Sequence, residues 1–121
     1  MATHNFKKLK VWQKAIDFIT FIYEVTSKFP KEEKYGLVDQ IRRASVSIAL
    51  NIAEGAGSGT NAEFKRFLKF SQRSAYEVLA ALEISTNLNM TNNKILTDAT
   101  VKADELSAML SGLIKSLKSD V

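Results

Sequence analysis

The sequence contains no cysteine, a single histidine and a single proline. Without cysteine the chain can form no disulfide, no thiolate metal site and no cysteine nucleophile. The only histidine, His4, lies in the polar stretch that opens the chain, where it is poorly placed to act as a general base. One histidine also cannot supply the pair of histidine ligands found in many zinc sites. These absences exclude cysteine chemistry and the commonest zinc sites.

No other group of residues forms a catalytic constellation. The acids Glu54, Glu77 and Glu83 do not stand in the Glu-x-x-His motifs of di-iron helical bundles. The serines between residues 36 and 59 have no histidine or lysine base at a suitable spacing. We therefore expect a protein that is not an enzyme and that holds no metal and no other cofactor.

Long apolar runs are also missing. The longest, residues 44–53, is interrupted by serines and an asparagine, and it falls short of the roughly 20 residues that span a membrane. Residues 1–6 are polar and are followed by no signal-peptide pattern. Hydrophobic residues make up 45% and charged residues 25%, as in ordinary globular proteins. The sequence predicts one domain over residues 1–121, cytoplasmic and with no membrane partner.

Helical periodicity is the main signal that the sequence does contain. Apolar residues recur at helical spacing in four stretches, and no stretch resembles a strand. Pro30 cannot continue a helix interior, Thr60 or Asn61 can cap the third helix, and Thr91 can cap the last. The predicted helices span approximately residues 9–29, 36–54, 61–89 and 92–118. Short connections between them favour an all-α fold, an up-down-up-down antiparallel four-helix bundle.

The glycines within residues 55–59 could in principle cradle a phosphate group. A dinucleotide site or a P-loop needs a preceding strand, and a P-loop also needs a Lys-Ser/Thr pair. Neither feature is present in the sequence. We predict that residues 55–59 form a flexible reversal between helices.

The predicted second helix carries a narrow polar stripe. On a helical wheel, at about 100° per residue, the stripe contains Gln40, Arg43, Ser47, Asn51 and Glu54. Apolar and small residues cover most of the remaining surface, and so wide an apolar arc needs partners on two sides. The first predicted helix has a second apolar row that includes Trp12 and Tyr23. Both patterns favour burial by a neighbouring subunit. The second apolar row of the first helix is explained equally well by burial against the other three helices of the same bundle.

Two interpretations of the adjacent arginines Arg42 and Arg43 stay open. Both can pair with Asp39 at helical spacings of three and four, which stabilises a helix by about 0.2–0.5 kcal/mol per pair. Alternatively, Arg43 joins the polar stripe in a buried or interfacial network that fixes helix register and subunit geometry. The predicted structural and interface residues are Gln40, Arg42, Arg43, Asn51, Glu54, Trp12 and Tyr23.

Basic residues are unevenly placed along a chain whose net charge is +4 and whose pI is near 9.4. One block precedes the first acid, Asp17, and a second lies on the outer side of the third helix, where Gln72 and Tyr76 are expected to join it. Such blocks favour polyanions, although many basic runs are simply solvated. The predicted nucleic-acid-binding residues are Lys65, Arg66, Lys69 and Arg73, joined by Lys7, Lys8 and Lys10.

The order and spacing of many short motifs resemble a known bacterial family. The motifs are Leu9 to Ala15, Ile22-Tyr23, Thr26, Phe29-Pro30, Tyr35 to Leu37, Gln40, Arg42 to Ala44, Ser47-Ile48, Asn51 to Gly55 and Arg66 to Leu68. They are similar to those of the four helix bundle protein family, also called the 23S ribosomal RNA intervening-sequence protein family. The accessory variability determinant of diversity-generating retroelements belongs to that family. Arg73 departs from the family pattern, because the resemblance places a glycine there.

The resemblance implies a homopentameric barrel of four-helix subunits with a basic surface and no established enzyme activity. It also implies that some members associate with nucleic acid or with a reverse transcriptase. Two functions follow as hypotheses. The first is a non-enzymatic nucleic-acid or ribonucleoprotein accessory protein that binds RNA or DNA. The second is a protein-binding scaffold whose partner, for example a reverse transcriptase, supplies the chemistry.

Overall fold

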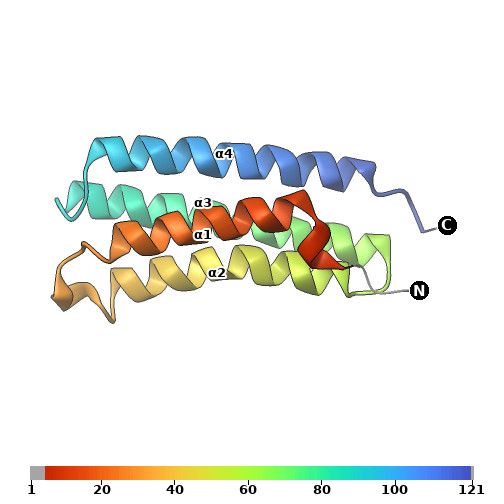
Figure 1. The fold of residues 1–121 in the computed structure, drawn as a ribbon, viewed down its shortest axis with the longest axis horizontal. Coiled ribbons are helices and arrows are strands. Elements are labelled where there is room, and N and C mark those ends of the chain that lie inside the picture. Colours follow the sequence, from red (N-terminus) through yellow and green to blue (C-terminus); the bar gives the residue numbers. More distant parts are fainter. Residues whose placement is uncertain (1–4, 121) are drawn as a thin grey trace.

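Four long helices form an antiparallel up-down-up-down bundle (Figure 1). The computed structural model describes residues 5–120, and His4 lies outside them. The elements are η1 (Phe6–Lys8), α1 (Lys10–Thr26), η2 (Lys31–Glu33), α2 (Leu37–Ala56), α3 (Asn61–Asn87) and α4 (Asn93–Ser116). Residues 5–120 contain no strand. The predicted all-α four-helix bundle is confirmed.

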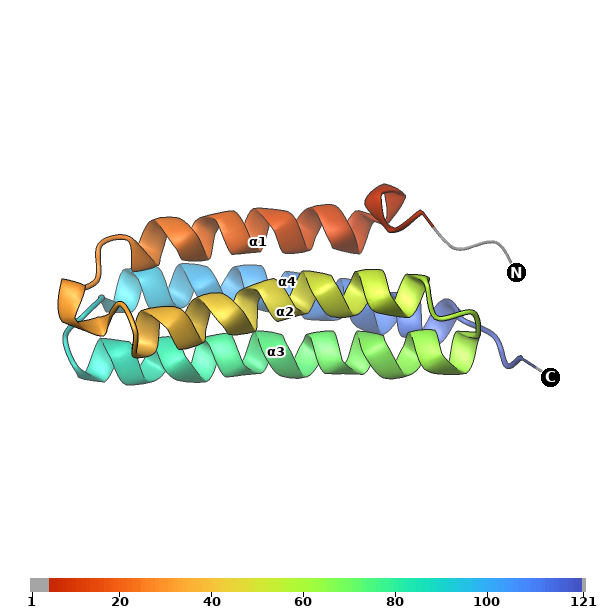
Figure 2. The same cartoon turned by 90° about the horizontal axis from the view of Figure 1, so that it is seen from below.

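Each helix packs against two of the other three. Helix α1 contacts α2 and α4, and α3 contacts the same two helices, so α1 and α3 lie diagonally opposite each other (Figure 2). Both chain ends lie at the end of the bundle where α3 begins and α4 stops (Figure 1). Because α1 and α3 are diagonally opposite, the outer face of α3 points away from α1.

The core is a continuous layer of apolar side chains between the four helices. The largest fully buried side chains include Phe18, Ile22, Ile41, Ile48, Ile52, Leu68, Leu82, Leu106 and Leu110. Between α2 and α3, the buried Ser71 hydroxyl donates to the Ile48 carbonyl at 2.8 Å. Between α1 and α4, the Lys14 ammonium donates to the Glu105 carboxylate at 2.7 Å. Polar contacts thus supplement the apolar core between these two helix pairs.

Close approach of α2 and α3 depends on Gly55. Helix α2 continues to Ala56, so Gly55 is a buried helical residue and is not part of the reversal that the sequence had suggested. A Cβ atom at this position would lie 2.8 Å from Phe67 Cβ and 2.9 Å from Phe64 Cδ1. The glycine is therefore required for packing against α3. The turn itself uses Gly59, whose φ of 97° favours a residue without a Cβ.

Side-chain caps set the starts of α3 and α4, whereas α1 ends at Thr26, three residues before its predicted end at residue 29. Helix α3 begins as expected, with the Thr60 hydroxyl accepting from the Glu63 amide at 3.2 Å. Helix α4 is capped by Asn92, which accepts from the Ile95 amide at 2.9 Å, and not by Thr91 as predicted. Asparagine caps a helix at least as well as threonine, so the helix begins one residue later.

Neither a membrane span nor a metal site emerges from the described residues. No helix within residues 5–120 is both long and apolar enough to cross a bilayer. The same residues contain no cluster of three His, Cys, Asp or Glu side chains that could hold a metal ion.

Candidate nucleic-acid interface

The outer face of α3 brings together the basic residues predicted on it. Lys65, Lys69 and Arg73 share this face because positions four residues apart lie on one side of a helix. Lys69 and Arg73 are exposed, and Lys65 is half-buried. Tyr76 continues this face and is 67% exposed. Gln72 was expected here, but its amide donates to the Ser107 carbonyl at 3.1 Å and to the Ser111 hydroxyl at 2.8 Å. Gln72 therefore belongs to the contact between α3 and α4.

Two arginines on this face are held in place by neighbouring side chains. Arg66 donates from Nε and Nη2 to both oxygens of Glu63, at 3.0 and 2.9 Å. These hydrogen bonds lower the pKa of Glu63 and raise that of Arg66. The Arg66 and Arg73 guanidinium groups lie 5.2 and 5.5 Å from the centre of the Phe70 ring. One phenyl ring thus orders two cations by cation–π contact.

The half-buried Phe67 also belongs to this cluster of aromatic and basic side chains. The ring of Phe67 also contacts Arg66, at 5.1 Å from its centre, and Phe70 packs edge-on against Phe67 at 6.0 Å. Phe70 lies three residues after Phe67 and four after Arg66, and this helical spacing is the signal that the sequence offers for the cluster.

The C-terminal tail adds a cation that the sequence had not assigned to this surface. Lys118 lines a hollow of about 390 Å³ with Lys65, Arg66 and Lys69 from α3. The Asp120 carboxylate enters the same hollow and accepts from the Asn61 and Ala62 amides at 2.7 and 2.9 Å. These backbone hydrogen bonds lower the pKa of Asp120, and the nearby charge of Lys65 adds to the effect.

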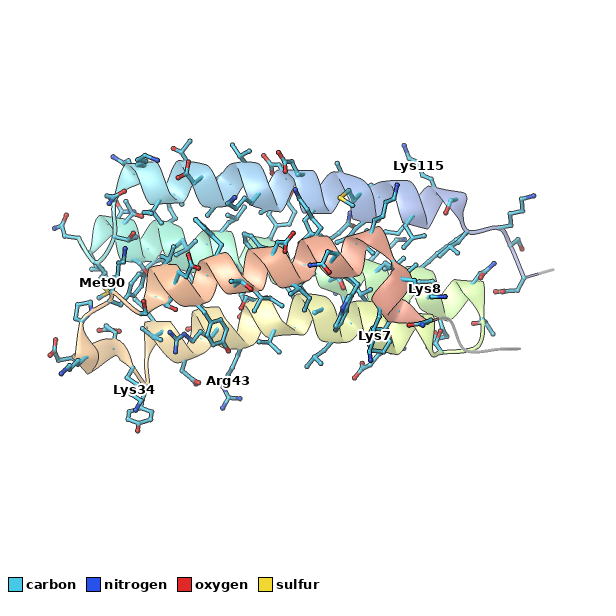
Figure 3. All side chains as sticks on the ribbon, viewed as in Figure 1. Lys7, Lys8, Lys34, Arg43, Met90 and Lys115 are labelled. Atoms are coloured by element: carbon cyan, nitrogen blue, oxygen red, sulfur yellow. The ribbon has the colours of Figure 1, made fainter. Side chains whose placement is uncertain are left out.

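The structure does not bring the first basic block onto the same face. Lys7 and Lys8 project from η1, and Lys10 begins α1, at the end of the bundle where Lys115 projects from α4 (Figure 3). Because α1 lies diagonally opposite α3, the outer face of α3 points away from these lysines. Trp12 packs edge-on against Phe6, with 4.6 Å between ring centres, and so holds η1 against α1. Within one subunit the two blocks share an end of the bundle and not a face.

Charge is consequently polarised along the bundle. The half that holds both chain ends carries Lys7, Lys8, Lys10, Lys14, Lys65, Arg66, Lys69, Arg73, Lys115 and Lys118. Its acidic residues are Asp17, Glu54, Glu63, Glu105 and Asp120. In the other half the acidic residues are at least as numerous as the basic ones. A polyanion that approaches the molecule therefore meets a positive end.

The two adjacent arginines of α2 have different partners. Arg42 does not pair with Asp39, and its side chain instead joins α2 to α1. Its Nε donates to the Thr26 hydroxyl at 2.8 Å, its Nη2 donates to the Tyr23 carbonyl at 3.3 Å, and its guanidinium lies 4.4 Å from the centre of the Tyr23 ring. Arg43 makes the local pair, with its Nε 2.9 Å from the Asp39 carboxylate. Its side chain is 80% exposed and points away from the bundle (Figure 3).

The polar stripe therefore forms no buried network with Arg43 inside one subunit. Gln40 and Glu54 are exposed. Asn51 is half-buried and donates to the Ser47 carbonyl at 2.9 Å, and the Ser47 hydroxyl lies 3.0 Å from that of Ser74 on α3. The network that does form joins α2 to α3 through small polar groups. An interfacial role for Arg43 stays a prediction.

An apolar groove lies between α1 and α2. Two adjoining hollows of about 490 and 420 Å³ share Tyr23 and Val46 in their walls. Ile19 lines the first hollow and Leu50 lines the second. Leu50 is 54% exposed and Tyr23 is 40% exposed. The groove thus exposes large apolar side chains next to Arg42 and Arg43.

Comparisons with known proteins identify a family for the sequence and a similar structure for the fold. The model of a family described as 23S rRNA-intervening sequence protein matches residues 7–112. A similar crystal structure is that of a protein of unknown function from the S23 ribosomal protein family of Bacteroides thetaiotaomicron. It has a TM-score of 0.80 and 23% identity, and the alignment covers 88% of this chain and 96% of that one. At this identity the likeness shows the fold. No curated protein matches the chain.

Proposed function

The chain belongs to the 23S rRNA-intervening sequence protein family, and from that premise we propose that it is a non-enzymatic accessory protein that binds RNA or DNA. The binding surface is the α3 basic surface, which consists of Lys65, Arg66, Lys69, Arg73 and Lys118. The observation that carries the proposal is the gathering of these cations at the positive end of the bundle. A cytoplasmic location belongs to the same proposal.

The α3 basic surface has the chemistry that phosphate contacts need. Within the described residues, Lys65, Lys69, Arg73 and Lys118 form no direct ion pair. Lys14, by contrast, pairs with Glu105, and Arg66 pairs with Glu63. Lysine and arginine side chains that are not held in a direct ion pair can replace the counterions of a nucleic acid. Tyr76 and the ordered guanidinium of Arg73 provide flat groups beside the lysines, which suits stacking with unpaired bases.

Self-association is the second part of the proposal. One subunit supplies only a few phosphate contacts, which predicts weak and strongly salt-dependent binding. An assembly repeats the same surface and raises the overall affinity through effective concentration. The groove between α1 and α2 supports assembly, because Tyr23 and Leu50 expose apolar surface that a second copy of this chain would cover. The pentameric state is an expectation carried over from the family resemblance.

A protein-binding scaffold is the alternative function. Beyond the basic residues, Ile84 near the end of α3 is 52% exposed, and Leu88, which follows the helix, is 55% exposed. Large exposed apolar side chains suit a protein partner better than a phosphate backbone. A reverse transcriptase, as the family resemblance implies, would be a partner of this class. In this case the positive end would serve mainly to steer association.

Charge reversal on α3 tests the proposal against the alternative. We expect the triple variant Lys65→Glu, Lys69→Glu and Arg73→Glu to bind duplex DNA and structured RNA at least about tenfold more weakly than the wild type, because several phosphate contacts become repulsive. The measurement is fluorescence anisotropy with labelled nucleic acid at fixed salt.

The matched control changes net charge equally at the other end of the bundle. Lys28, Lys31 and Lys34 are exposed there. Reversing these three to glutamate should weaken binding far less than the α3 variant does. Equal losses in the two triple variants would mean that only net charge matters, and the α3 surface would then be the wrong assignment.

A further inference from the structure

The C-terminal tail, residues 117–120, folds back onto the beginning of α3. Helix α4 ends at Ser116, and the half-buried Leu117 starts the tail. The Asn61 side chain donates to the Lys118 carbonyl at 2.9 Å. The two oxygens of Asp120 then accept separately from the Asn61 and Ala62 amides. Directed hydrogen bonds from Asn61 and Ala62, which are adjacent at the start of α3, therefore help to hold the tail.

The docked carboxylate is an anion inside the α3 basic surface. Asp120 shares its hollow with the side chains of Lys65, Lys69 and Lys118. The fourth cation in the hollow, Arg66, is already paired with Glu63. Backbone amides at a helix start and lysine side chains are also common phosphate ligands in protein–DNA contacts. The groups that hold Asp120 are therefore of the kind that would contact a nucleic-acid phosphate.

We propose that the tail is an intramolecular competitor, in which Asp120 occupies part of the α3 basic surface until a nucleic-acid phosphate displaces it. The inference rests on the proposed function and adds its regulation. The docked tail lowers the positive potential at Lys65 and fills space beside Lys69. Displacement frees these lysines, together with Lys118, for phosphate contacts.

The tail is built to leave this position without disturbing the bundle. Lys118, Ser119 and Asp120 are all exposed and are not part of the apolar core, and Leu117, which packs against the core, can stay in place when they leave. The Glu63 amide keeps its hydrogen bond to the Thr60 hydroxyl when the tail is gone, so α3 retains its own cap. The exchange of one anion for another is therefore confined to the tail and the first turn of α3.

Asp120→Ala is the direct test, and Asp104→Ala is its matched control. Asp104 is an exposed aspartate in the middle of α4, so the two substitutions change net charge identically. We expect Asp120→Ala to bind duplex DNA about threefold or more tightly than Asp104→Ala. Its slope of log affinity against log salt should be steeper by about 0.9, which corresponds to one additional phosphate contact. Circular dichroism should show unchanged helix content in both variants.

A second readout follows the tail itself. In wild-type protein labelled with ¹⁵N, the heteronuclear NOE of the Asp120 amide should fall when duplex DNA is added, because the displaced tail becomes mobile. An NOE unchanged at saturation, or equal affinities of Asp120→Ala and Asp104→Ala, would show that the tail does not compete. If the wild type and both variants fail to bind at low salt, the proposed function fails and this inference fails with it. Binding by all three with no difference overturns the inference alone.

Discussion

Gly55→Ala is expected to lower the free energy of unfolding by about 2 kcal/mol, within the range measured for overpacked cores. The new methyl group would lie 2.8 Å from Phe67 Cβ and 3.3 Å from the Phe64 carbonyl oxygen. Both atoms are fixed by the α3 backbone, so no side-chain rotation can relieve the contact. Helix α3 would have to move away from α2, which would also disturb the hydrogen bond between Ser71 and Ile48.

The measurement is urea unfolding followed by circular dichroism at one fixed protein concentration, because the proposed self-association would make apparent stability depend on concentration. Gly112→Ala is the matched control. Gly112 lies within α4, and a Cβ there has no atom within 4 Å. We expect this variant to be more stable by about 0.5–1 kcal/mol, the helix-propensity difference between glycine and alanine. Similar effects of the two substitutions would contradict the close packing of α2 against α3.

Leu50→Lys is expected to prevent the proposed self-association and leave the helical fold intact. Leu50 is 54% exposed in the single chain, so a charged residue is tolerated there in the monomer. In the apolar groove between two copies, the same ammonium group would be buried without a partner, which is strongly unfavourable. Light scattering should give a multiple of 13.5 kDa for the wild type and about 13.5 kDa for the variant.

Loss of assembly should also weaken nucleic-acid binding, by about 10²- to 10⁴-fold if several subunits bind together. The substitution adds a positive charge, so this loss cannot come from electrostatic repulsion. Leu88→Lys is the control, because Leu88 is 55% exposed but follows α3, outside the groove. A monomeric wild type, or an assembled Leu50→Lys variant, would contradict self-association through the groove.

The bundle could be predicted from the sequence because apolar periodicity directly reports which side of a helix is buried. Phe18, Ile48, Leu68 and Leu106, one from each helix, are buried in the structure. Helix ends were less accurate, because a local signal competes with tertiary packing. Gly55 begins a glycine-rich run that is typical of a loop, yet it lies in α2, where it packs against α3.

The charged surface was only partly predictable. The spacing within α3 correctly gathers Lys65, Lys69 and Arg73, since that grouping depends on one helix alone. The separation of Lys7 and Lys8 from this face depends on the diagonal placement of α1 and α3, which no local pattern specifies. The arrival of Asp120 at α3 likewise depends on where α4 ends in space.

Arg42 and Arg43 illustrate the same limit within one helix. Their helical positions differ by about 100°, enough to direct one toward α1 and the other toward solvent. Helical spacing allowed both to reach Asp39, and only the position of α1 decides between them. Arg42 takes Thr26 as its partner, and Arg43 takes Asp39.

Salt-dependent binding by the wild-type protein tests the central claim most directly. Labelled structured RNA and labelled duplex DNA would be titrated by fluorescence anisotropy from low to physiological salt. The account predicts micromolar or tighter binding at low salt, with log affinity falling linearly against log salt by about 0.9 for each phosphate neutralised on duplex DNA. Absence of binding to either nucleic acid at the lowest salt would contradict a nucleic-acid function and favour the protein-binding scaffold.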